Sequence, residues 1–227
     1  GQSAFVLDGK LKSKQWHLAL PESEKPMPML EPAIVLGVSD AALFKKAAGE
    51  YRSIVNDLIA KLHDEKPDQI PKFEIPIPEV KKIKAGSIYF YGLPPPLGID
   101  SQIAPSAGLS ESVLAFTISQ NHAERLLTST PLKVDNGPLA DRKRPLLGAV
   151  YFDFAGTIDT LSPWIDFGAR AALPFARGLD PDQAEDILKQ VVTGLEILKV
   201  LRSYASATYF EDGKLVTHGE TIIQDLK

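Results

Sequence analysis

The chain has 227 residues, of which 44% are hydrophobic and 24% are charged; this is long enough for one large domain or two small ones, with the composition of a globular protein. Its net charge of −4 and its scattered lysines and arginines argue against a nucleic-acid-binding protein, because such proteins usually carry a concentrated basic surface. The absence of cysteine excludes disulfides, thiolate catalysis and cysteine-ligated zinc.

The N-terminal quarter predicts strands followed by one helix. The stretch AFVLDGKLKSKQWHLALP predicts a hairpin that turns at Asp8-Gly9, since Asp-Gly favours the positive φ angles of a tight turn. PESEKPMPMLEP is expected to be a loop, and the apolar run AIVLGVS a buried strand. Ser39 or Asp40 then caps a helix that extends to about His63. The predicted inner face of this helix is Phe44, Ala47, Ala48, Tyr51, Val55, Leu58 and Leu62.

The next segment, KFEIPIPEVKKIKAGSIYFYGLP, predicts a second hairpin that turns near Ala85-Gly86. Pro76 and Pro78 lack backbone donors, so their strand is expected at the edge of a sheet. The proline-rich residues 94–110 predict a loop, and a loop of this length in a compact domain is often functional.

Two strand–helix units follow. After the strand SVLAFTIS, Asn121 is expected to cap a short helix, with Glu124 completing a capping box. After the strand LLGAVYFDF, a helix is expected from about Ser162, because Pro163 is tolerated near a helix start.

The last helix is expected to open with the sequence DPDQ, which begins at Asp180. Its predicted inner face is Ile187, Leu188, Val191, Leu195, Leu198 and Leu201. A final hairpin is predicted around Asp212-Gly213. Hairpins interspersed with helices favour an α+β fold, with a largely antiparallel sheet and three to four helices packed mainly on one face. We expect a single domain over residues 1–227, a piece of a longer exported chain, with a two-lobed division near residues 94–110 as the alternative.

The stretch AVYFDFAGTIDT resembles the first motif of the haloacid dehalogenase-type phosphatases. In that resemblance Asp153 matches the nucleophile, and Gly156 and Thr157 match the turn that follows it. Ala155 stands where the usual second aspartate would be, as in a phosphonatase branch with Asp-x-Ala-Gly-Thr. The chain after Asp153 lacks a strand ending in an acidic pair before its final hairpin, so we expect either Asp153 or Thr157 to cap the next helix.

The histidines do not form a recognisable catalytic or metal-binding motif. His17, His63, His122 and His218 are far apart in the sequence. His218 and Glu220 share one face of a strand, which suits two ligands of a metal site, an acid–base pair or an ordinary solvent-facing strand, and we expect the last of these. The sequence therefore predicts no catalytic, cofactor-binding or metal-binding residue, and no cofactor.

Aromatic residues suggest a different kind of site. Tyr89, Phe90 and Tyr91 follow one another in a strand beside a proline-rich loop, and Trp16, Tyr151 and Tyr209 lie in other expected strands. Either these rings fill the core, or they line a groove for an apolar ligand or partner on a sheet face that no helix covers.

The segments FVLDGKLKSKQWHLALP, VSDAALFKKAAGEY, HAERLLTSTPL and TIDTLSPWIDFG resemble a family of exported bacterial proteins, a domain of unknown function. The resemblance implies a periplasmic or extracellular location and a role in binding or assembly. No secretory signal is visible and no apolar run reaches the ~18 residues of a membrane span.

We therefore expect a non-enzymatic domain that binds an apolar small molecule or a protein partner, which can be a second copy of the chain, and that does not bind nucleic acid. The alternative is a hydrolase whose site lies around His218 and Glu220 or around Asp153.

Overall fold

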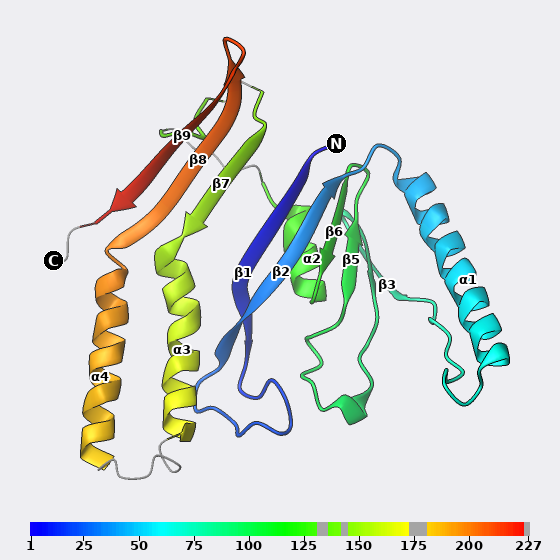
Figure 1. Cartoon of the computed structure of the whole chain (residues 1–227), viewed down its shortest axis with the longest axis horizontal. Helices are drawn as coiled ribbons and strands as arrows, with labels where there is room; N and C mark the ends of the chain where they lie inside the picture. The colour runs from blue at the N-terminus through cyan, green and yellow to red at the C-terminus, as the bar shows by residue number, and fades with distance from the viewer. Residues whose placement is uncertain (131–135, 142–144, 173–180, 225–227) are drawn as a thin grey trace. The chain divides into compact units, whose positions relative to one another are not determined.

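The structure is a computed structural model that describes residues 1–130, 136–141, 145–172 and 181–224. Within these residues it contains nine strands and four α-helices, which confirms the expected α+β class (Figure 1). The strands are β1 (Ser3–Ser13), β2 (Met27–Gly37), β3 (Glu79–Ile83), β4 (Gly86–Phe90), β5 (Ser106–Leu109), β6 (Val113–Thr117), β7 (Gly148–Asp153), β8 (Leu201–Glu211) and β9 (Lys214–Ile223). The helices are α1 (Ala41–Glu65), α2 (Gln120–Thr128), α3 (Phe154–Ala172) and α4 (Pro181–Leu198), with a short 3-10 helix η1 (Pro95–Leu97).

The chain divides into two compact units. The first consists of Gly1–Leu11, Trp16–Leu20 and Glu31–Ser129, and the second of Lys12–Gln15, Pro21–Leu30 and Thr130–Lys227. Residues 94–110 lie inside the first unit, where they contain η1 and β5. The long strands β1 and β2 contribute residues to both units.

The first unit contains a six-stranded sheet with the order β1-β2-β6-β5-β4-β3, in which the four neighbouring pairs from β2 to β3 are antiparallel. Helix α2 packs against β4, β5 and β6. Gly108 of β5 permits this close approach, because a Cβ atom there would lie 3.1 Å from the Leu127 side chain and 3.3 Å from Ala123. Helix α1 lies on the opposite side of the sheet and buries none of its residues.

The second unit contains an antiparallel sheet with the order β7-β8-β9. Strand β7 continues directly into α3, and α3 contacts both α4 and β8. Lys199, just after α4, forms ion pairs with Asp159 of α3 at 2.6 Å and with Glu196 of α4 at 2.5 Å. The Trp164 indole in α3 donates a hydrogen bond to the carbonyl of Pro28, which attaches the first residues of β2 to this unit.

Several local predictions are confirmed. Asp40 caps α1 by accepting a hydrogen bond from the Leu43 amide at 2.8 Å. The hairpin of β3 and β4 turns next to Gly86, as predicted. Strand β3 lies at the edge of the sheet, also as predicted, but it begins at Glu79, so Pro76 and Pro78 precede the strand and are not part of it. The hairpin of β8 and β9 turns at Asp212 and Gly213, whose φ angles are 47° and 73°.

The predicted first hairpin is wrong, because β1 continues through Asp8 and Gly9. The Asp8 carboxylate accepts from the Gly9 amide and pairs with Arg125, so it stabilises an extended strand and not a turn. Strand β2 also begins earlier than predicted, inside the proline-rich segment, at Met27.

Two predicted helix starts are also wrong. Ser119 caps α2 in place of Asn121, and Glu124 pairs with Lys81 of β3 at 2.7 Å instead of closing a capping box. Helix α3 starts at Phe154, so Pro163 lies in its interior.

The predicted inner faces of two helices are only partly covered. In α1, Tyr51 is 69% exposed and Leu58 is 54% exposed. In α4, Leu188 is buried but Ile187 is half exposed. Asp180, the predicted first residue of the last helix, lies outside the described residues.

Candidate functional site

A cleft of about 690 Å³ separates α1 from the sheet of the first unit. This volume is in the range of small-molecule sites. Helix α1 contributes one side of the cleft, and the strands β3 to β6 form its floor. The lining residues are Phe44, Lys45, Ala48, Gly49, Arg52, Ile77, Pro78, Val80, Tyr89, Tyr91, Pro105, Ser106, Ala107, Leu109, Leu114, Phe116 and Thr117.

The floor follows from the pairing register. Val80, Tyr89, Ala107, Phe116 and Ile34 are directly opposite one another across five strands, so their side chains form one apolar row on one face. The other face carries the residues that alternate with them, and it packs against α2. The strands are therefore apolar on both faces, whereas only the α2 face is closely covered.

The cleft leaves large apolar side chains accessible. Val80 is 50% exposed, Phe116 43% and Ile77 74%. Two of the α1 residues that line this space, Ala48 and Gly49, are small and leave room in it. An exposed, concave apolar surface of this kind is typical of binding sites.

The segment after α1 also borders the cleft. The Asn56 side chain accepts from the Ile75 amide at 2.8 Å and donates to the Ile75 carbonyl at 3.1 Å, and a His63 ring nitrogen lies 2.7 Å from the Ile70 carbonyl. These bonds hold the returning segment along α1. They thereby place Ile77 and Pro78 beside the cleft.

The charged residues that line the cleft are both basic. Lys45 and Arg52 project from α1, and no carboxylate is among the lining residues. The Lys45 ammonium nitrogen lies 5.8 Å from the centre of the Tyr89 ring, within the range of a cation–π contact. The cleft therefore combines an apolar floor with two cations.

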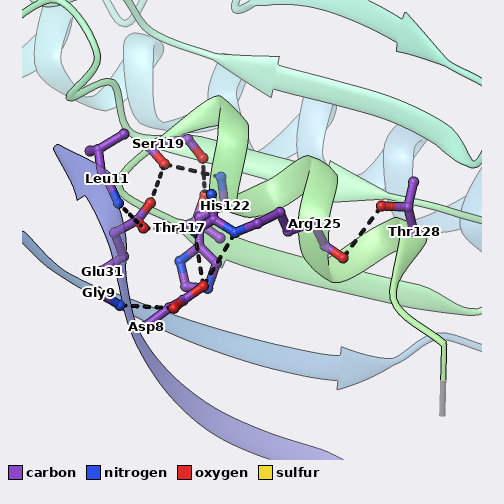
Figure 2. A network of polar contacts seen from close by, with 9 residues as sticks. All are labelled: Asp8, Gly9, Leu11, Glu31, Thr117, Ser119, His122, Arg125 and Thr128. Carbon is purple, nitrogen blue, oxygen red and sulfur yellow. Dashed lines mark hydrogen bonds and ion pairs between the residues drawn. The ribbon is translucent and has the colours of Figure 1, made fainter. Parts of the chain in front are cut away.

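A second feature is a buried polar cluster beneath α2 (Figure 2). The Glu31 carboxylate is fully buried and accepts hydrogen bonds from the Leu11 amide at 3.0 Å and the Ser119 hydroxyl at 2.7 Å. Arg125 donates to Glu31 at 2.6 Å and to Asp8 at 3.0 Å. The cluster thus joins β1 and β2 to both ends of α2.

His122 lies in the same cluster and is only 1% exposed. Within the described part of the chain, neither of its ring nitrogens has a hydrogen-bond partner. Burial lowers the pKa of His122 below the usual 6.5, because the charged imidazolium loses its hydration. The nearby charges act in both directions: Glu31 and Asp8 favour the charged form, and Arg125 and Lys10 oppose it.

Glu31, Ser119 and His122 contain the groups of a hydrolytic triad, but their geometry does not support catalysis. The Ser119 hydroxyl donates to Glu31 and its oxygen accepts from the His122 backbone amide, so it is engaged in capping the helix. All three residues are at most 1% exposed, and a substrate cannot reach the hydroxyl. We interpret the cluster as a structural connection between α2 and the sheet.

The buried His122 predicts a dependence of stability on pH. The unfolded chain binds a proton near pH 6.5, whereas the folded chain binds it only at lower pH. The contribution of neutral His122 is therefore fully present above about pH 6.5 and is lost as the pH falls, by at most ~1.4 kcal/mol per pH unit. Urea unfolding between about pH 7 and pH 5 should show this decrease. The variant His122→Leu should show a smaller decrease of stability with falling pH. His218→Gln, which changes an exposed residue of β9, is the control and should show the same decrease as the unaltered protein. An equal dependence of stability on pH in the unaltered protein and in His122→Leu would contradict the assignment.

The residues that the sequence singled out for chemistry are not brought together. Asp153 accepts from the Gly156 amide at 2.9 Å, which confirms the first of the two capping alternatives. His218 and Glu220 lie opposite Ala207 and Ala205, so they share a face of β9 as predicted, and both are exposed. No group of three metal-binding side chains occurs in the described ranges.

The aromatic residues divide between the two expected roles. Tyr89 and Tyr91 line the cleft, whereas Phe90 alternates with them and belongs to the α2 face. Trp16 is buried. In the second unit Tyr151 is 58% exposed and Tyr209 is partly buried.

The polar cluster was missed at the sequence level, although one signal for it exists. Glu31 interrupts the apolar strand sequence MPMLEPAIVLG, and a carboxylate in such a run is usually buried with a partner. The partner, Arg125, is 94 residues away, and nothing in the sequence identifies it.

Comparisons with protein-family models, with curated proteins and with solved structures found no match. Among the described helices, none has the length and apolar character needed to cross a membrane.

Proposed function

We propose that this protein is a binding domain whose first unit holds an apolar small molecule in the cleft between α1 and the sheet. The observation that carries the proposal is the cleft itself, about 690 Å³ over a row of apolar side chains. Binding a ligand there would remove Val80 and Phe116 from water and so gain hydrophobic free energy.

The shape of this surface favours a small molecule over a protein partner. A protein partner usually contacts a flat or protruding apolar patch, whereas this surface is hollow and has aromatic side chains at its floor. We also propose that binding takes place outside the cytoplasm, as the resemblance to exported proteins implies.

Filling the cleft tests the proposal. The variant Ala48→Trp places an indole on the α1 side of the cleft, and Ala60→Trp makes the same change at an exposed position of α1 that does not line it. With the uncharged dye Nile red as probe, Ala48→Trp should weaken binding by about tenfold, which corresponds to ~1.4 kcal/mol. Ala60→Trp should bind like the unaltered protein.

Dye fluorescence and displacement by long-chain alcohols provide the measurement, and circular dichroism shows whether each variant is folded. Absence of dye binding to the unaltered protein would overturn the proposal, and so would equal binding by the two tryptophan variants.

A further inference from the structure

A second hollow, of about 650 Å³, adjoins the apolar cleft. The two spaces share Lys45, Tyr89 and Leu109 in their linings. The second hollow lies between the start of α1, the turn of the β3–β4 hairpin and the turn between β5 and β6. Its lining residues are Ala41, Ala42, Lys45, Lys82, Ile83, Lys84, Ala85, Gly86, Ser87, Tyr89, Leu109, Ser110, Glu111 and Ser112.

The sheet register shows how the apolar surface gives way to a basic one. In the row next to Val80 and Tyr89, Lys82 is opposite Ser87 on the same face. One step of two residues along β3 therefore changes the side chain from apolar Val80 to basic Lys82. The apolar cleft and the basic hollow are parts of one continuous face.

The hollow carries an excess of positive charge. Three lysines line it, Lys45, Lys82 and Lys84, against one carboxylate, Glu111. Among the described residues, no ion pair is formed by Lys82 or Lys84, and the contact of Lys45 is with the Tyr89 ring. Lys81, which points to the opposite face, is by contrast paired with Glu124. The cations on the cleft side are thus available to an external anion.

We propose that the ligand is a single-chain amphiphile with an anionic head group, of the fatty-acid type. Its chain lies along the apolar row under α1, and its head group lies among Lys45, Lys82 and Lys84. This inference rests on the proposed function and adds the chemical class and the orientation of the ligand. Charge complementarity carries the choice of an anion, because three cations face one carboxylate next to the apolar cleft.

The first test compares two probes of equal chain length, palmitate and hexadecanol, as competitors of Nile red. Palmitate should bind about tenfold more tightly at low salt, since each exposed charge contact contributes roughly two- to fivefold. Added salt should reduce the difference because it screens exposed charges. Equal affinity for the acid and the alcohol would overturn the inference and leave the proposed function standing, whereas no binding of either would overturn both.

The second test uses neighbouring lysines on opposite faces of β3. Lys82→Gln should weaken palmitate binding by about threefold and leave hexadecanol binding unchanged, because it removes one cation from the hollow. Lys82→Arg should retain the affinity. Lys81→Gln, the matched control, should change neither ligand, and an equal loss in both glutamine variants would overturn the inference.

Discussion

Replacing Glu31 with alanine is expected to lower the free energy of unfolding by about 3 kcal/mol, since removing one partner of a buried ion pair leaves the other uncompensated. Glu31 is fully buried and accepts from three donors, which include Ser119 and Arg125. Arg125 is 31% exposed and keeps Asp8, so water and Asp8 recover part of the loss. A loss of this size is a large fraction of the ~5–15 kcal/mol that stabilises a typical domain.

Urea unfolding of the purified variants measures this effect, with Asp8→Asn as the matched control. Asp8 contacts the same Arg125 but is 24% exposed, so its replacement should cost only about 1 kcal/mol. A cost for Glu31→Ala no greater than that for Asp8→Asn would show that the buried cluster does not stabilise the fold.

Replacing Gly86 with alanine is expected to destabilise the first unit by about 3 kcal/mol, because backbone strain and a steric clash act together. Gly86 has a φ of +154°, and an added Cβ atom would lie 2.2 Å from the Leu109 carbonyl oxygen. That oxygen belongs to the backbone of the paired strand β5, so it cannot move aside without disturbing the pairing of β4 and β5. The same strands form the floor of the cleft, and dye binding should fall with stability.

The control is Gly194→Ala in α4, where an added Cβ atom meets no atom within 4 Å. Alanine is favoured over glycine in a helix by about 0.5–1 kcal/mol, so this variant should be slightly more stable than the unaltered protein. Thermal unfolding distinguishes the two changes by their opposite signs. A Gly86→Ala variant with unchanged stability would show that the close approach to Leu109 is not tight.

The sequence by itself determined those features that depend on a few neighbouring residues. Asp40 caps α1 and Asp153 caps α3. In each case the carboxylate accepts from an amide only three residues further along the chain, so the interaction is local. The Asp212-Gly213 turn follows from the φ angles that these two residues permit. The α+β class follows in the same way, from hairpins and helices whose signals are local.

The tertiary structure decided the features that depend on distant partners. Asp8-Gly9 has the composition of a turn, yet strand β1 continues through both residues. In this strand Asp8 pairs with Arg125, which is 117 residues away in the sequence. Ser119 and not Asn121 caps α2, and its hydroxyl also bonds Glu31, 88 residues away. Local propensity is weak compared with burial and pairing, so it does not predict such outcomes.

The cleft belongs to the second group. The apolar spacing of α1 predicts a helix that packs on the sheet, and α1 does form, yet it buries none of its residues. Periodicity shows which side of a helix is apolar, but not how closely that side approaches its neighbour. That distance depends on the side chains that meet there, and between α1 and the sheet they leave about 690 Å³ unfilled.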